Sequence, residues 1–295
     1  MIHDSVDNAK KSSCCPSQGG RQDMAQRQKL EDEAIKNSLS KIKHKIFILS
    51  GKGGVGKSSI SANLAATLSK KGYKTGLMDV DVHGPSIAQM LGLTELLDIS
   101  ENKLLIPKQV NGNLKVVSVQ ALMQDKDQAI IWRGPAKTGM IRQFVSSVEW
   151  GELDFLIIDA PPGTGDEPLT VVQTIPEALG VIVTTPQEVA LADIRKSISF
   201  CKTVHLKTLG IVENMAGFKC PHCSGHIDLF SSGGGKKTAK AQGLEFLGSI
   251  PFDTDVVVSD DSGVPMMLKD NKPEFSKNFD TVVENIIKQL KKRVS

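Results

Sequence analysis

From residue 44 onward, short apolar runs alternate along the chain with longer stretches whose apolar residues recur at helical spacing. Each run is about six residues long and mostly apolar, which is typical of strands buried on both faces of a parallel sheet. We therefore predict strands at residues 45–50, 75–80, 114–119, 154–160, 180–185, 209–213 and 244–250. The stretches between them predict helices at residues 57–71, 135–148, 187–204, 234–242 and 275–293.

Strands and helices that alternate in this way indicate a doubly wound α/β fold with a mainly parallel sheet. No linker interrupts the pattern, so we predict one domain over residues 44–295. Residues 1–43 are different, because they are polar and show no apolar periodicity until Leu30. We predict a mobile tail over residues 1–26 and a short helix over residues 27–40.

The composition is typical of a globular cytoplasmic protein. Of 295 residues, 40% are hydrophobic, which is enough to form a substantial core. The net charge of +3 gives no reason to expect a nucleic-acid partner, and no apolar run is long enough to predict a membrane partner. The first residues match neither a secretory signal nor a transit peptide. Five irregularly spaced cysteines indicate reduced thiols, so we expect a cytoplasmic location.

A glycine-rich segment lies directly after the first predicted strand and before the first long predicted helix. It reads Gly-Lys-Gly-Gly-Val-Gly-Lys-Ser and matches the phosphate-binding pattern G-x-x-x-x-G-K-[ST]. Its glycines let backbone N–H groups and the helix N-terminus face a phosphate. Lys57 is placed to neutralise the β- and γ-phosphates, and Ser58 to bind Mg²⁺. The nucleotide-binding residues predicted here are Gly51, Lys52, Gly53, Gly54, Val55, Gly56, Lys57, Ser58 and Ser59.

Acidic residues end two other strands at the same edge of the predicted sheet. Asp159 can hold the Mg²⁺ shell, and residues 160–166 continue as a loop able to sense the γ-phosphate. One of Asp79 and Asp81 can orient an attacking water, while a buried or turn-forming Asp is the alternative for each. The guanine-reading pattern N-K-x-D is absent, so ATP is the expected nucleotide.

In this order along the chain, the motifs GKGGVGKSS, DVDVHGPS, IIDAPPGTGDE and VENMAGF resemble those of the deviant Walker-A ATPases. The segment Trp132-Arg133-Gly134-Pro135 and a C-x-x-C pair are similar to the Mrp/ApbC branch, which includes cytosolic scaffolds for iron–sulfur assembly. The resemblance covers residues 44–290 and implies a MinD-like P-loop fold and a dimer that binds ATP and hydrolyses it slowly.

The same resemblance implies individual roles. Lys52 matches the signature lysine that reaches the partner's nucleotide, and Asp81 matches the switch aspartate near the attacking water. Asn214 matches the adenine-contacting position. Lys52, Lys57 and Asp81 are therefore the expected catalytic residues. A solvated surface lysine is the alternative for Lys52.

The C-x-x-C pair is Cys220-Pro221-His222-Cys223, which places two thiolates within reach of one metal. An iron–sulfur cluster held by cysteines alone needs four thiolates, and the sequence has no second C-x-x-C. A two-fold dimer supplies four, because each copy contributes one pair. The resemblance implies the same arrangement, in which Cys220 and Cys223 bridge a [4Fe–4S] cluster between subunits.

Other interpretations of the cysteines stay open. Cys220 and Cys223 can form a zinc knuckle with His226 and His222, or they can be a redox dithiol or inert surface thiols. Cys201 has the register of a small core residue. Cys14 and Cys15 resemble a remnant of the N-terminal four-cysteine motif of eukaryotic-type scaffolds. A delivery segment, a partner contact and no role at all are the alternatives for this pair.

Two functions are compatible with these motifs. The first is an ATP-binding and slowly hydrolysing carrier that assembles a labile [4Fe–4S] cluster at a homodimer interface and transfers it to apo-proteins. A heterodimer with a homologue is an alternative assembly. The second is a MinD/ParA-like switch ATPase with structural zinc at the C-x-x-C.

Overall fold

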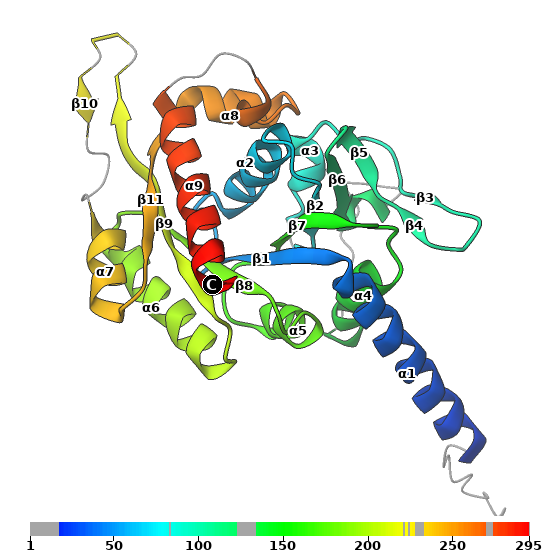
Figure 1. Cartoon of the computed structure of the whole chain (residues 1–295). Coiled ribbons are helices and arrows are strands. Elements are labelled where there is room, and N and C mark those ends of the chain that lie inside the picture. Colours follow the sequence, from blue (N-terminus) through cyan, green and yellow to red (C-terminus); the bar gives the residue numbers. More distant parts are fainter. Residues whose placement is uncertain are drawn as a thin grey trace, which may run out of the picture.

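A computed structural model describes residues 18–82, 84–122, 134–220, 222–223, 225–227, 233–269 and 274–294. In this part of the chain, nine strands form one sheet, in the order β10-β9-β8-β1-β7-β2-β6-β5 with β11 also paired to β9 (Figure 1). The strands are β1 Ile42–Ser50, β2 Thr75–Asp79, β5 Lys108–Asn111, β6 Leu114–Ser118, β7 Leu153–Asp159, β8 Leu179–Thr184, β9 Thr208–Lys219, β10 His226–Ile227 and β11 Phe246–Phe252. A separate hairpin consists of β3 Asp98–Ile99 and β4 Leu105–Ile106.

The sheet is mainly parallel, as the apolar runs predict. Each predicted strand overlaps one of the parallel strands β1, β2, β6, β7, β8, β9 and β11, and in the described part of this sheet only β5 and β10 run antiparallel to their neighbours. The central strand β1 pairs with β7 on one side and with β8 on the other. Its carboxyl end, like those of β2 and β7, therefore meets the same edge of the sheet.

Helices cover both faces of the sheet, which confirms the doubly wound fold. The α-helices are α1 Gln18–Ser40, α2 Lys57–Lys70, α3 Ile87–Met90, α4 Gly134–Ser146, α5 Asp166–Thr174, α6 Glu188–Thr203, α7 Gly234–Gln242, α8 Thr254–Asp261 and α9 Glu274–Val294. One buried cluster joins the sheet to α1, α4, α5, α6 and α7, and a second joins its other face to α2, α3 and α9. No helix in the described ranges is long and apolar enough to cross a membrane.

The N-terminal region differs from the prediction. Helix α1 begins at Gln18, so the tail predicted over residues 1–26 was wrong from that residue onward, and the helix is longer than the predicted 27–40. The part of α1 that was predicted as helix packs on the domain, because Ile35 and Leu39 are buried in the core. Arg142 of α4 also forms ion pairs with Glu31 and Asp32.

Three sets of sequence predictions lie outside the described residues. They concern Cys14 and Cys15, the pair Trp132-Arg133, and the remainder of the tail before Gln18.

Candidate functional site

The glycine-rich loop lies between the end of β1 and the start of α2. This is the topological switch point of the sheet, because β7 and β8, which are consecutive along the chain, pair with opposite sides of β1. Gly54 and Gly56 have φ angles of 77° and 79°, in the left-handed region that favours glycine. Gly56 is the residue before α2, so the free N–H groups of the helix face the loop. The loop, Asp81 and Pro162 line a cavity of about 280 Å³. This geometry suits a polyphosphate.

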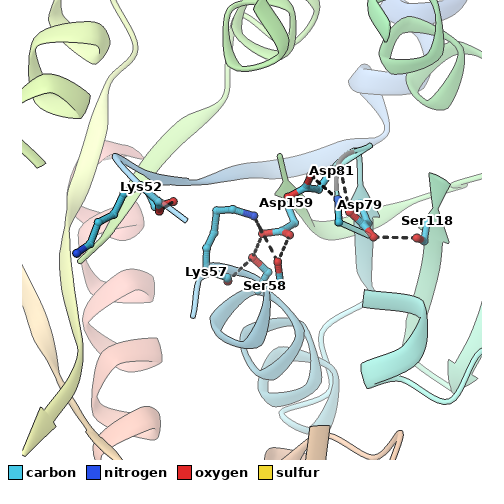
Figure 2. Close-up of polar contacts among 10 residues, drawn as sticks. Lys52, Lys57, Ser58, Asp79, Asp81, Ser118 and Asp159 are labelled. Carbon is cyan, nitrogen blue, oxygen red and sulfur yellow. Dashed lines mark hydrogen bonds and ion pairs between the residues drawn. The ribbon is translucent and has the colours of Figure 1, made fainter. Parts of the chain in front are cut away.

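Lys57 and Ser58 line this cavity, and their side chains converge on Asp159 (Figure 2). The Lys57 ammonium lies 2.8 Å from Asp159 Oδ1, and the Ser58 hydroxyl donates to Asp159 Oδ2 at 2.7 Å. Ser61, which the sequence analysis did not single out, also donates to Asp159 Oδ1 at 2.7 Å. Asp159 is fully buried, so these three donors and the charge of Lys57 stabilise its carboxylate. Ser58 and Asp159 present the oxygen ligands that Mg²⁺ prefers.

Asp79 and Asp81 follow at the end of β2, the next strand but one from β1. Asp79 is fully buried and accepts hydrogen bonds from the Ser118 hydroxyl and the Asp81 backbone N–H, at 2.8 and 3.0 Å. Burial, with repulsion from Asp159, raises the pKa of Asp79 to about 7. Asp81 lines the phosphate cavity, so of the two residues it is the one placed to reach a nucleotide.

The raised pKa of Asp79 makes stability depend on pH. The unfolded chain ionises this carboxyl near pH 3.8, and the folded chain ionises it near pH 7, so folding takes up a proton between these values and stability falls as pH rises through them. Asp79→Asn stays neutral throughout. In EDTA without nucleotide, we expect the free energy of unfolding of Asp79→Asn to rise relative to that of the wild type as pH increases from 4 to 7, by at most about 4 kcal/mol.

Urea unfolding across this pH range checks the expectation, with Asp261→Asn as a control that removes an exposed charge. A difference between Asp79→Asn and wild type that stays constant from pH 4 to 8 would show that Asp79 ionises normally.

Lys52 and Asn214 lie at the rim of the loop. The Lys52 side chain points away from Lys57 and Asp159 (Figure 2), and its ammonium donates to Gln187 Oε1 at 3.1 Å. Asn214 lies inside β9, not after a strand as predicted, and its Nδ2 donates to the Val55 carbonyl at 2.9 Å. A Cβ atom on Gly56 would lie 2.3 Å from this Nδ2, so the loop glycine permits the contact. Asn214 therefore connects β9 to the phosphate loop.

The C-x-x-C pair lies where β9 turns back into β10, and we call Cys220, Cys223 and the paired strand ends Lys219 and His226 the cysteine hairpin. The Cys220 N–H donates to the Gly225 carbonyl at 2.9 Å, which closes the turn. Hydrogen bonds from the backbone of Cys223 and His222 and from the Cys223 thiol lower the pKa of Cys220. A lower pKa favours the thiolate, the form that binds metals.

The remaining candidate ligands do not join this pair. Among the described residues, which include His222 and His226, no group of three or more His, Cys, Asp or Glu has metal-binding geometry. The ring of His226 instead packs against Gly217, where a Cβ atom would lie 2.4 Å from it. Cys201 is buried in the core, as its register predicts, and burial raises the pKa of its thiol.

One residue of the site, and one neighbour of Asn214 in β9, carry little signal in the sequence. Ser61 lies one turn into α2, and only the fold brings it to Asp159. Glu213 is buried in β9, where it accepts a hydrogen bond from the Gly235 N–H at the start of α7. Its place at the end of an apolar run hinted at a buried acceptor, but its donor lies 22 residues away.

The fold and the loop define a P-loop nucleotide-binding protein. A family model described as ParA-type, NUBPL iron-transfer P-loop NTPase matches residues 41–287. The chain belongs to this family, which confirms the resemblance drawn from its motifs.

Relatives and solved structures agree with this assignment. The chain is 48% identical to the iron-sulfur cluster carrier protein of Methanococcus maripaludis, over 94% of this chain and 98% of that protein. It is 44% identical to the cytosolic Fe-S cluster assembly factor CFD1 of Saccharomyces cerevisiae, over 87% of this chain and 90% of that protein. The nucleotide-binding protein of Archaeoglobus fulgidus, solved with ADP, is 40% identical with a TM-score of 0.72, over 84% of this chain and 96% of that one. MinD of Pyrococcus horikoshii, at 20% identity over 84% of this chain and 97% of that one with a TM-score of 0.62, shares the fold.

Proposed function

We propose that this protein is an ATP-dependent carrier that assembles a labile [4Fe–4S] cluster between two copies of the chain and transfers it to apo-proteins. The observation that carries the proposal is that one strand, β9, holds Asn214 against the phosphate loop and ends one residue before Cys220. A nucleotide site and a thiolate pair are therefore joined by one strand. The names of the archaeal and yeast relatives support the cargo, and the name of the yeast relative supports a cytoplasmic location.

The thiolate count supports a dimer. The cysteine hairpin contributes two thiolates, and a cluster held by cysteines alone needs four, which two hairpins related by a two-fold axis supply. A homodimer is the simplest such assembly, and a heterodimer with a homologue has the same thiolate count. The hairpin is exposed at Cys223, as a shared site requires.

The chemistry proposed for the nucleotide site uses the residues described above. Lys57 and the loop N–H groups would bind the phosphates of ATP, and Ser58 and Asp159 would hold Mg²⁺, which supplies charge neutralisation of the phosphates when bound. Asp81 would orient the attacking water. The Lys52 ammonium would leave Gln187 Oε1 and bind a phosphate of the nucleotide held by the partner subunit.

Anaerobic reconstitution with iron and sulfide tests the cargo directly. We expect about four irons and four sulfides per two chains, a broad absorbance band near ~400 nm, and a dimer by native mass spectrometry. Zinc bound without sulfide would contradict the carrier function and favour a switch ATPase with a structural zinc. One cluster per single chain would contradict the bridging arrangement.

A further inference from the structure

Helix α8 lies between the nucleotide site and the cysteine hairpin. It begins after β11, whose last residue Phe252 pairs with Phe218 of β9, two residues before Cys220. The start of α8 faces the hairpin across a cavity of about 620 Å³, lined by Asp253–Asp255 on one side and by Cys220 and His226 on the other. A helix of eight residues is about 12 Å long, so its other end lies well away from this cavity.

That other end contacts the nucleotide site. The Ser59 hydroxyl donates to Asp260 Oδ2 at 2.6 Å, and Ser59 lines the phosphate cavity next to Ser58. Asp260 is only 9% exposed, and its second oxygen, Oδ1, is buried with no hydrogen-bond partner among the described residues. Burial raises the pKa of Asp260, and the hydrogen bonds from Ser59 and from Asn63, both in α2, oppose this rise.

A second contact joins α8 to the segment that carries Asp81. This segment leads into α3, which ends before Gly92, and α8 ends before Gly263. The two glycines touch, since a Cβ atom on Gly263 would lie 2.8 Å from Gly92 Cα. Both have φ angles in the left-handed region, 65° and 75°. Neither helix can therefore move far at this end without displacing the other.

The Ser59 hydroxyl has one proton and can donate it to Asp260 or to a bound phosphate, but not to both. When a phosphate takes the proton, the buried Asp260 carboxyl loses its hydrogen bond from Ser59 and keeps only the interaction with Asn63, while Oδ1 still has no hydrogen-bond partner among the described residues. Such a group is costly, so the segment that carries it has to shift until water or another donor reaches it.

We propose that Asp260 is the positioning residue through which nucleotide binding at the P-loop reaches the cysteine hairpin, with α8 as the element that moves. The inference rests on the proposed function of a nucleotide-controlled carrier. Loss of the Ser59 donor lets the C-terminal end of α8 shift together with α3, and the Asp253–Asp255 wall moves relative to Cys220. The access of solvent and of a receiving protein to the thiolates changes with it.

Thiol-labelling rates at Cys220 and Cys223, read by peptide mass spectrometry on the full-length cluster-free protein, test this coupling. Saturating Mg·ADP is expected to change these rates by a factor of about 5 in the wild type and in Asp261→Ala, which removes the neighbouring exposed carboxylate. In Asp260→Ala the change should fall below about 2-fold. Asp260→Asn keeps an oxygen that accepts from Ser59, so it should restore most of the response, which a merely structural role of Asp260 would not predict.

The inference would be overturned if Mg·ADP changed the labelling rates in Asp260→Ala as much as in the wild type. It would also be overturned if Mg·ADP left the wild-type labelling rates unchanged. If Asp260→Ala does not fold, hydrogen exchange of residues 254–264 in the wild type decides, because exchange that Mg·ADP leaves unchanged also overturns it. Failure of the proposed function is distinct. Thiols that respond to Mg·ADP in a protein that binds no cluster would leave the coupling standing without the carrier function.

Discussion

Lys57→Ala is expected to lower the affinity for Mg·ATP by about 100-fold, because a lysine that makes charged hydrogen bonds to phosphates contributes about 3 kcal/mol. The ammonium of Lys57 is buried at the base of the loop cavity, 2.8 Å from Asp159 Oδ1. Water cannot easily take its place there. Titration calorimetry with Mg·ATP measures the loss.

A matched control is Lys71→Ala, which removes a lysine just after the other end of α2, where its ammonium lies 3.5 Å from Asp280. We expect no change in Mg·ATP affinity for this variant. An affinity of Lys57→Ala within about 5-fold of the wild type would contradict the role of Lys57. Cluster transfer that survives in Lys57→Ala would contradict the coupling of ATP to the cargo.

Lys57→Ala also leaves Asp159 buried without its charge partner. Removing one partner of a buried ion pair costs about 3 kcal/mol of stability or more. The hydroxyl groups of Ser58 and Ser61 still donate to the Asp159 carboxylate at 2.7 Å each, so we expect the variant to fold. Circular dichroism of the variant establishes this before binding is measured.

Cys220→Ala and Cys223→Ala are each expected to abolish the cluster. Either change removes one ligand per chain and leaves two thiolates per dimer, where a cysteine-ligated cluster needs four. After anaerobic reconstitution, the iron content and the band near ~400 nm should fall to background. Mg·ATP binding should be retained, since neither cysteine lines the loop cavity.

Cys201→Ala is the control, because it removes a thiol that is buried in the core away from the hairpin. It should keep the full iron and sulfide content. A chromophore that persists in Cys220→Ala would show that the ligands lie elsewhere, and Cys14 and Cys15 would then be the next residues to replace.

The central strands and the phosphate loop could be predicted because their signals are local. A strand buried on both faces has to be apolar along its length, and a loop that wraps a phosphate needs glycines at fixed spacing. Parallel strands also place their carboxyl ends together, which is why Asp159 was expected beside Ser58 and lies at 2.7 Å from it.

Other features could not be predicted because their partners lie far away in the sequence. The strand at 209–213 was expected to end at Glu213, yet β9 continues to Lys219, because its later residues pair with β11 and β10. Helix α8 contains three consecutive valines, which favour a strand by propensity, but Asp253 caps its start by accepting from the Asp255 N–H. The contact between Ser59 and Asp260 joins residues 201 positions apart.

The length of β9 sets the distance between the phosphate loop and the cysteine hairpin. Asn214, which contacts the phosphate loop, and Cys220 are six positions apart, which in an extended strand corresponds to on the order of 20 Å. At physiological ionic strength, exposed charges are screened over about 8 Å. Through solvent, the charge of a bound polyphosphate would therefore act only weakly on iron bound at Cys220. We expect the nucleotide to influence the cargo chiefly by moving segments of the chain, and added salt to weaken this influence little.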